Sequence, residues 1–459
     1  MKKIQFKVTV ITTIIMFGLN ACAGSQLTKS SPIVVTLPTI TPTATPVLLG
    51  EYELFSPDDL RSDVDQLFHV IEAFHPAPYA KRSKQDIDLE RQHLYQELSQ
   101  PMTDIEFYKK IAPLLNSLGD YHTNIFPGDE TINVIRKNEL LLPFEIQING
   151  QHAYIVANYS GNASIEYGDE LLEVNGTPMT EIMRFWPVGR HFLPMDVWFL
   201  LGSSHEYQVK LLPQSQIEPI TLIVPGLTDE EMQSNTEMDK PIEAVQYTTL
   251  PGENIGVLTI NNFWKVAPLV NRAMLQVRDD QVQHLIIDLR SNRGGLLIQA
   301  ETTINYLITQ PYRTCSLSYT APFDGYGSAK PTEIECEQKY PKNISQPYQG
   351  KLYVLIGPDT VSAGVLFATV LQDHKLAILI GEETDTPASM CGNVVLERAH
   401  LSHTRLQYRY SRTCYVRPNG ILDDHGVIPD IMIKTTINDQ INNTDPVLDH
   451  TLQMIREGE

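Results

Sequence analysis

The sequence predicts a mostly parallel α/β core that follows a small helical region and a β-rich region. From Gly256 onward, apolar strand candidates alternate with helix candidates, a pattern typical of a parallel sheet covered by helices. Apolar residues recur at helical spacing over 57–118, and strand-like alternation of apolar and polar residues dominates 141–225. The predicted segments are a leader (1–21), a tether (22–50), a helical domain (51–128), a β-rich domain with an insertion (129–240), an α/β core (241–436) and a C-terminal helix (437–459).

The N-terminus has the features of an export signal. Two lysines follow Met1, an apolar stretch covers 8–19, and the letters L-N-A-C ending at Cys22 resemble a bacterial lipobox, whose cysteine is lipid-modified. Residues 25–49 are rich in Thr, Pro and Ser and too polar to pack into a core. We therefore expect an extracytoplasmic protein that is anchored to a bacterial membrane through lipid on Cys22.

Composition excludes some partners and favours others. Hydrophobic residues make up 42% of the chain and charged residues 20%, which is ordinary for a globular protein. The formal net charge of −20 argues against nucleic acid and anionic membrane surfaces as partners, so membrane contact is expected only through the lipid anchor. Four further cysteines in an exported chain suggest two disulfides, and we favour the sequence-local pairs Cys315–Cys336 and Cys391–Cys414.

The β-rich region contains a nine-residue stretch, G-D-E-L-L-E-V-N-G over 168–176, that is similar to a segment of PDZ domains. There a strand runs into an Asn-Gly turn. No clear carboxylate-binding loop accompanies it, so peptide binding by this domain is not predicted.

The core region contains strand candidates at 256–261, 285–289, 352–356 and 377–380, with helices that begin near Ala267, Gly295 and Ser362. Residues 445–456 form a short amphipathic helix by the same reasoning.

Ser362 lies where a buried strand ends and a helix begins. The unpaired N–H groups and the dipole of a helix N-terminus favour a developing negative charge, which suits a nucleophile beside an oxyanion hole. A second interpretation remains open on this stretch alone, because serine is also a frequent helix N-cap.

Three further stretches contain residues that suit the same chemistry. D-L-R-S-N-R-G-G, ending at Gly295, closes a buried strand with two glycines that let a substrate carbonyl approach backbone N–H groups. His122 lies in D-Y-H-T after the helical region, and Asp423 precedes a glycine turn in L-D-D-H-G-V-I-P-D. His400 and His403 would face opposite sides of a strand, so no metal site is predicted from their spacing.

Together these four stretches resemble the tail-specific, or C-terminal-processing, serine peptidases. The resemblance is to the tricorn-core branch, which is related to interphotoreceptor retinoid-binding protein, and it spans roughly 53–433. In that family D-x-H-T, D-x-R-x-N-x-G-G, T-x-S-A-G/A and E-x-x-G-V-x-P-D recur. The resemblance implies a ClpP/crotonase-like α/β core preceded by helical and PDZ-like domains.

Carried over residue by residue, the resemblance implies that Ser362 is the nucleophile and His122 the general base. Gly294 or Gly295, together with Ala363, would supply the oxyanion N–H groups.

The family's glutamate falls on Asp423, a shorter carboxylate that can still orient the imidazole. Asp424 and His425 remain alternatives for completing the set, with His425 as a rival base. Another branch of the family uses a Ser–Lys dyad, but the corresponding loop, 384–389, holds no lysine, and Lys375 is expected at the far end of the serine helix.

The sequence therefore predicts an exported serine endopeptidase that acts on polypeptides by acyl transfer. No metal or nucleotide cofactor is expected, since no phosphate loop is present. The alternative is a binding lipoprotein that keeps the peptidase fold without turnover, because the same superfamily contains retinoid-binding relatives.

Overall fold

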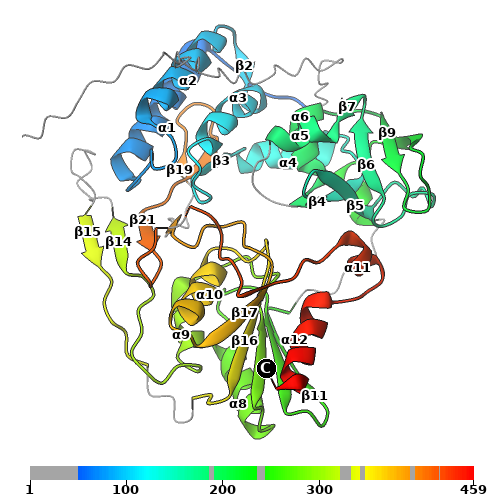
Figure 1. The fold of residues 1–459 in the computed structure, drawn as a ribbon. Coiled ribbons are helices and arrows are strands. Elements are labelled where there is room, and N and C mark those ends of the chain that lie inside the picture. Colours follow the sequence, from blue (N-terminus) through cyan, green and yellow to red (C-terminus); the bar gives the residue numbers. More distant parts are fainter. Residues whose placement is uncertain are drawn as a thin grey trace, which may run out of the picture. The chain divides into compact units, whose positions relative to one another are not determined.

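The computed structural model describes residues 50–185, 191–234, 243–320, 332–341, 347–392, 399–422 and 424–458 (Figure 1). These residues all belong to one unit of the chain, 42–459. The predicted leader, Cys22, nearly all of the predicted tether and Asp423 lie outside the described residues, so what the sequence predicts for them stays a prediction.

A six-stranded sheet, ordered β11-β12-β13-β16-β17-β22, forms the centre of the C-terminal half. β11 is antiparallel to β12, and every other neighbouring pair is parallel. The strands are Val245–Leu250 (β11), Ile255–Ile260 (β12), His284–Asp288 (β13), Lys351–Ile356 (β16), Ala377–Gly381 (β17) and Ile431–Met432 (β22). The four core strands expected from the sequence, and their mostly parallel arrangement, are confirmed.

Helices cover both faces of this sheet, which explains why its strands read as continuous apolar runs. Leu352, Val354 and Ile356 of β16 pack into the cluster under α8, α9 and α10, whereas Tyr353 and Leu355 pack under α12. Figure 1 shows α9 and α10 on one side of the sheet and α12 on the other. The helices are Ala267–Asp279 (α8), Leu297–Ile304 (α9), Ala363–Asp373 (α10) and Pro446–Glu457 (α12).

The N-terminal helical region packs around an apolar cluster that also includes Trp198 and Tyr408 from later in the chain. Its helices are Pro57–Phe74 (α1), Lys84–Glu97 (α2), Asp104–Asn116 (α3) and Asp129–Asn138 (α4), with Leu54–Phe55 (β1) paired to Met102–Thr103 (β2). The predicted capping box is present, since the Ser56 hydroxyl accepts the Asp59 N–H and the Asp59 carboxylate accepts the Ser56 N–H. Strand β3 (Asn124–Phe126) leaves this region to pair with β20 (Gln407–Arg409).

The β-rich region is a seven-stranded sheet ordered β10-β9-β6-β5-β4-β8, with β7 beside β6. The predicted turn is present, because Asn175 and Gly176 both have positive φ and link β6 to β7. Its elements are Phe144–Asn149 (β4), His152–Asn158 (β5), Glu170–Val174 (β6), Thr177–Pro178 (β7), Met179–Phe185 (α5), His191–Phe192 (β8), Pro194–Leu201 (α6), Glu206–Leu212 (β9), Ile220–Pro225 (β10) and Asp229–Ser234 (α7).

Two smaller sheets complete the fold. A four-stranded sheet is ordered β15-β14-β21-β18, and β19-β20-β3 forms the other. Their remaining elements, with the short α11, are Leu317–Thr320 (β14), Thr332–Glu335 (β15), Met390–Gly392 (β18), Ala399–His400 (β19), Thr413–Val416 (β21) and Ile437–Ile441 (α11).

The structure joins the cysteines in the two pairs that the sequence favoured. Cys315 is bonded to Cys336, and Cys391 of β18 is bonded to Cys414, its directly opposite partner on β21. Within the described part of the chain, no helix combines the length and the apolar character that crossing a membrane requires.

Candidate active site

Ser362 joins β16 to α10 with backbone angles that few non-glycine residues adopt. Its φ is 54° and its ψ is −112°, a conformation that costs on the order of 1–3 kcal/mol and persists only where surrounding structure enforces it. Although Ser362 stands at the N-cap position of α10, its side chain makes no capping hydrogen bond. Capping therefore does not explain this serine, whereas a strained strand-to-helix turn is how other hydrolase folds present a nucleophile.

Two glycines bring a second piece of backbone against Ser362. A β-carbon placed on Gly294 (φ 83°) would lie 2.7 Å from the Ser362 β-carbon, and one on Gly295 (φ 138°) would lie 2.5 Å from the carbonyl carbon of Phe263. No side chain fits either position, and both φ angles favour glycine. Gly294 is thus required by its close approach to the serine, and Gly295 by its packing against the Phe263 backbone.

The N–H groups around Ser362 differ in whether they are already used. The Gly294 N–H donates to Asn292 Oδ1 at 2.9 Å. Among the described residues, the N–H groups of Gly295 and Ala363 have no hydrogen-bond partner. Ala363 is also the first residue of α10, where the helix dipole adds positive potential. These two donors are therefore available to an oxyanion, whereas Gly294 serves the turn itself.

Asn292 connects the segments that build this turn. It is fully buried, its Nδ2 donates to the Ile260 carbonyl at 2.7 Å, and its own carbonyl accepts the Val361 N–H at 2.8 Å. A β-carbon on Gly364 would approach Asn292 Oδ1 to 3.0 Å, which explains the glycine in S-A-G. The asparagine of D-x-R-x-N thus holds the end of β12, the Gly294 turn and the serine turn together.

The Asp and Arg of the same motif form an ion-pair network on the other side of the strand end. Arg290 contacts Asp288 (Nη2 to Oδ2, 2.7 Å) and Asp445, the N-cap of α12 (Nη1 to Oδ1, 2.7 Å). Burial opposes its charge, yet the two carboxylates hold the pKa of the Arg290 guanidinium above its usual range. This network fixes α12 to the sheet.

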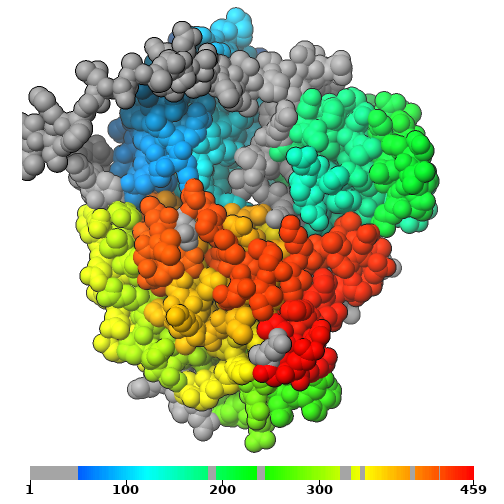
Figure 2. Space-filling view, in the orientation of Figure 1, coloured from blue at the N-terminus to red at the C-terminus, as the bar shows by residue number. Residues whose placement is uncertain are grey.

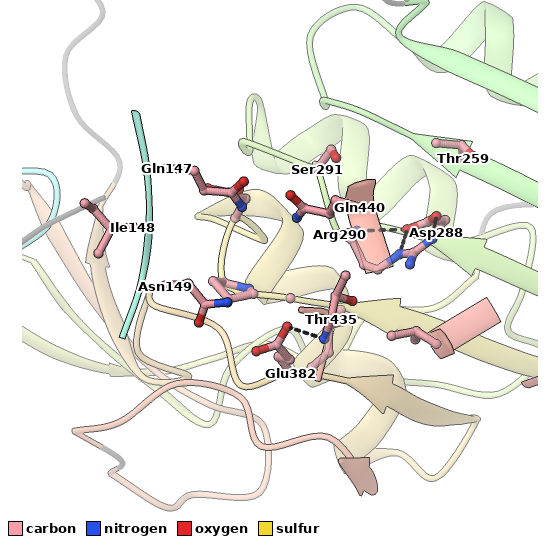
Figure 3. Close-up of a pocket in the computed structure, with 15 residues that line it drawn as sticks. Gln147, Ile148, Asn149, Thr259, Asp288, Arg290, Ser291, Glu382, Thr435 and Gln440 are labelled. Atoms are coloured by element: carbon pink, nitrogen blue, oxygen red, sulfur yellow. Dashed lines mark hydrogen bonds and ion pairs between the residues drawn. The ribbon is translucent and has the colours of Figure 1, made fainter. Parts of the chain in front are cut away.

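A cavity of about 260 Å³ lies beside this network. Figure 3 shows Gln147 and Asn149 of β4 on one wall, with Glu382 on the core side. Neither Ser362 nor His122 lines the cavity, but Pro358 and Asp359, in the turn before the serine, do.

His122 lies in the loop between α3 and β3 and packs against β18. A β-carbon placed on Gly392 would be 3.7 Å from His122 Cε1 and 3.8 Å from Nδ1. The Nδ1 atom is buried and has no hydrogen-bond partner within the described structure. Burial lowers the pKa of the imidazole, the Asp120 charge opposes this, and the Arg409 charge on β20 adds to it. The ring is therefore neutral near pH 7 and able to accept a proton.

Loop 382–389, which follows β17, contacts both the serine turn and the strand beside the histidine. The Asp385 N–H donates to the carbonyl of Pro358, in the turn before the serine, at 3.3 Å. The same loop continues into β18, whose last residue, Gly392, contacts His122.

Charges near the serine turn also act on the residue next to His122. Burial raises the pKa of the Tyr121 phenol, and the charges of Asp385 and Asp359 raise it further. Asp359 lies three positions before Ser362, and Tyr121 adjoins His122. In the described part of the chain no hydrogen bond joins Ser362 to His122, and loop 382–389 is the segment that contacts the neighbours of both.

Asp424, in the L-D-D-H-G stretch, is linked to the histidine loop through Lys81. Lys81 Nζ donates to the Asp424 carbonyl at 3.3 Å, and the Lys81 side chain packs on Gly119, three positions before His122. Asp423 itself is outside the described residues. The contact through Lys81 therefore concerns Asp424 and does not define the carboxylate.

His425, the rival base, faces a different set of atoms. Its Nδ1 lies 2.8 Å from the Gly426 carbonyl oxygen and 3.6 Å from Glu383 Oε1, and its side chain is 46% exposed. Lys375 follows the end of α10, so the whole helix, about 16 Å at 1.5 Å per residue, separates it from Ser362.

Sequence reasoning missed three residues that hold the site. Asn292 was noted only as part of a motif, Glu383 accepts the Gly426 N–H at 2.9 Å, and Asp120 accepts the His122 N–H at 3.1 Å. The motif letters D-x-R-x-N and D-x-H-T were the available signal for the first and third, but no local pattern indicated the Glu383 contact.

Comparisons with known proteins show which proteins this chain resembles. Residues 254–433 match the sequence model of Peptidase family S41. The chain is 27% identical over 139 residues to a tail-specific protease of Haemophilus influenzae (30% of this chain, 18% of that protein), and 24% identical over 236 residues to a probable CtpA-like serine protease of Staphylococcus haemolyticus (51% and 44%). The chain thus spans less than half the length of these relatives.

Solved structures show a similar fold. The chain superimposes on mature CPAF complexed with lactacystin with a TM-score of 0.63, at 16% identity, covering 83% of this chain and 95% of that one. A putative peptidase from Parabacteroides merdae gives a TM-score of 0.50 at 14% identity, covering 87% and 96%. At these identities the likeness concerns the fold alone.

Proposed function

Because residues 254–433 belong to peptidase family S41, we propose that this protein is a serine endopeptidase that hydrolyses polypeptides through an acyl-enzyme on Ser362. The observation that carries the proposal is the Ser362 turn. Its hydroxyl makes no capping bond and its φ is positive. The N–H groups of Ala363, the next residue, and of Gly295, next to the Gly294 that packs on Ser362, have no partner among the described residues. Such a turn costs folding free energy and provides a nucleophile with an oxyanion site in return.

The chemistry follows from these positions. Ser362 Oγ attacks the peptide carbonyl carbon while His122 takes the hydroxyl proton, and the resulting oxyanion accepts N–H groups from Gly295 and Ala363. Collapse of the tetrahedral adduct breaks the C–N bond, and His122 gives its proton to the leaving amine. A water molecule then repeats the sequence on the ester, which releases the acid and restores Ser362.

His122 suits the base role because burial lowers its pKa and keeps it neutral near pH 7. Its buried Nδ1 lacks an acceptor among the described residues, an arrangement that leaves a hydrogen bond unmade. We assign Asp423 as the carboxylate that accepts this N–H and orients the ring, because its neighbour Asp424 accepts a hydrogen bond from Lys81, which packs beside the histidine loop.

We also propose a PDZ-like domain and a ClpP/crotonase-like core. The strand that enters the Asn175–Gly176 turn supports a PDZ-like domain at 129–240, and the parallel sheet with helices on both faces supports a ClpP/crotonase-like core at 241–436.

We also propose that the protein is exported and held at a bacterial membrane by lipid on Cys22, with 22–50 as a spacer. The basic start, apolar stretch and L-N-A-C letters support this. Cys22→Ala should lose membrane fractionation and detergent partitioning. Membrane association equal to that of the unchanged protein would refute the anchor.

Hydrolysis of an unfolded polypeptide by the full chain tests the enzymatic proposal. The wild-type protein should cleave it, and Ser362→Ala should not, while both unfold at similar temperatures. If the wild-type protein binds the polypeptide but leaves it intact, the alternative of a non-catalytic binding protein replaces the peptidase.

A further inference from the structure

The loop that carries His122 is folded around one buried carboxylate, Asp120. Its Oδ1 accepts the His122 N–H at 3.1 Å, its Oδ2 accepts the Thr123 hydroxyl, and its backbone carbonyl accepts the Thr123 N–H at 3.2 Å. The Thr123 hydroxyl in turn accepts the Ser411 N–H at 3.2 Å. Asp120 therefore fixes the main chain on which the imidazole stands and ties it to the segment after β20.

A second buried histidine holds this carboxylate. His75 Nε2 lies 3.0 Å from Asp120 Oδ2, and the His75 side chain is 1% exposed. Its Nδ1 accepts the Ala77 N–H at 3.0 Å, which places the ring proton on Nε2 and directs it at Asp120. Although burial alone would raise the pKa of Asp120, the hydrogen bond from His75 is the largest of the contributions that hold it well below its usual range.

The proposed reaction gives neither His75 nor Asp120 a direct role. His75 is the C-cap of α1, and its Nε2 faces Asp120. We propose that the buried His75–Asp120 pair is a positioning element for His122: Asp120 fixes the histidine main chain, and His75 fixes Asp120. This inference rests on the proposed role of His122 as the base.

Three groups set the charge environment of the His122 ring. Asp120 comes from its own loop, Arg409 from β20, and the Cys391 backbone from β18. Burial lowers the His122 pKa, Asp120 and the Cys391 backbone raise it, and Arg409 lowers it. Neutralising Asp120 therefore lowers this pKa further, so the acid limb of a rate that depends on neutral His122 moves to lower pH.

The test uses the full chain and a fluorophosphonate probe, whose rate of reaction with Ser362 is measured from pH 4 to 9. Asp120→Asn should slow labelling by up to about 100-fold, as misplacement of a base does, and should move the acid limb to lower pH. Asp169→Asn is the matched control. Asp169 is also a buried carboxylate that accepts two backbone N–H groups, from Glu166 (2.9 Å) and Gln214 (3.1 Å), but it lies in the β-rich region. This control should lower the melting temperature and leave the labelling profile unchanged.

A second pair of variants keeps the test decisive if Asp120→Asn does not fold. In His75→Gln the side-chain amide N–H can replace the Nε2–H donor of the imidazole, whereas His75→Leu has no donor. Labelling should be slow in the leucine variant and recover in the glutamine variant. Wild-type rates in Asp120→Asn or in His75→Leu would overturn the inference. If Ser362→Ala were still labelled, the proposed function itself would fail. If Ser362→Ala were not labelled but the Asp120 and His75 variants reacted at wild-type rates, only the positioning role would be refuted.

Discussion

The two halves of the candidate site are built in different ways. The serine half comes from the carboxyl edge of one parallel sheet, where Asn292 joins the ends of neighbouring strands and Gly294 packs on Ser362. The histidine half is assembled from distant segments. His122 follows the helical region, packs on Gly392 of β18, and is fixed through Asp120, which His75 holds.

This difference teaches where the site is vulnerable. The serine turn is held by the same strands and glycines that make the core, so it persists whenever the core folds. The histidine loop depends on contacts between segments that are far apart in the sequence, so we expect small changes there to displace the base and leave the nucleophile intact. Substitutions near His122 are therefore expected to lower activity strongly while they lower the stability of the fold only a little.

The largest expected effect comes from removing one reacting group in each half. Ser362→Ala and His122→Ala should each reduce turnover by on the order of 10⁴ or more, and the double variant should be scarcely slower, because the two act as one unit. Steady-state hydrolysis of an unfolded polypeptide, with thermal melts, measures this. Independent, multiplying losses would show that the halves do not work together.

A methyl group at Gly294 should break the serine half directly. Gly294→Ala should abolish activity and lower the free energy of unfolding by about 2–4 kcal/mol, since it combines positive φ with a 2.7 Å contact to the Ser362 β-carbon. Gly176→Ala is the matched control, because its φ of 79° is similar and a β-carbon there meets no atom within 4 Å. It should cost about 1 kcal/mol and leave activity unchanged. Equal losses of stability and activity in both variants would contradict the close-packed serine turn.

Substitutions in the L-D-D-H-G turn test which residues assist His122. Asp423→Asn should slow hydrolysis less than His122→Ala does, since the base and the oxyanion donors remain. Asp424→Asn should change little, because its register relative to Gly426 does not match the family's carboxylate. An inactive His425→Ala together with an active His122→Ala would transfer the base role to His425.

Removal of the disulfides is expected to have the smallest effect on the rate of Ser362 labelling, and the two disulfides differ in whether they support the histidine. They close sequence separations of 21 and 23 residues, so each should contribute a similar stability, roughly 3 kcal/mol in the chain-entropy model. Replacing Cys391 and Cys414 by alanine should also slow labelling of Ser362 several-fold, because Cys391 adjoins Gly392, which contacts His122. Replacing Cys315 and Cys336 should reduce only the melting temperature. Equal labelling rates in the two double variants would show that β18 does not support the histidine.

Much of the serine half could be predicted from the sequence because its signals are local. The strand expected at 352–356 is β16, the strand at 285–289 is β13 within one residue, and α10 begins directly after Ser362. The choice between Gly294 and Gly295 as donor was not predictable. It depends on the Asn292 side chain accepting the Gly294 N–H, which only the folded turn determines.

The histidine half could be predicted only as a list of residues. Nothing near His122 in the sequence indicates that Gly392 packs on its ring or that His75 holds Asp120, because these contacts form between elements whose order in space comes from tertiary packing. Resemblance to a family supplied the residue, and the structure supplied its neighbours. The carboxylate at Asp423 remains a prediction.

The most direct test of the central claim is to map the adduct that a fluorophosphonate probe forms with the full chain and to measure its rate. The account predicts one phosphonate per chain, on the peptide that contains Ser362, formed rapidly in the wild-type protein and far more slowly in His122→Ala. An adduct on another residue, or equal labelling rates in the wild-type and His122→Ala proteins, would contradict it.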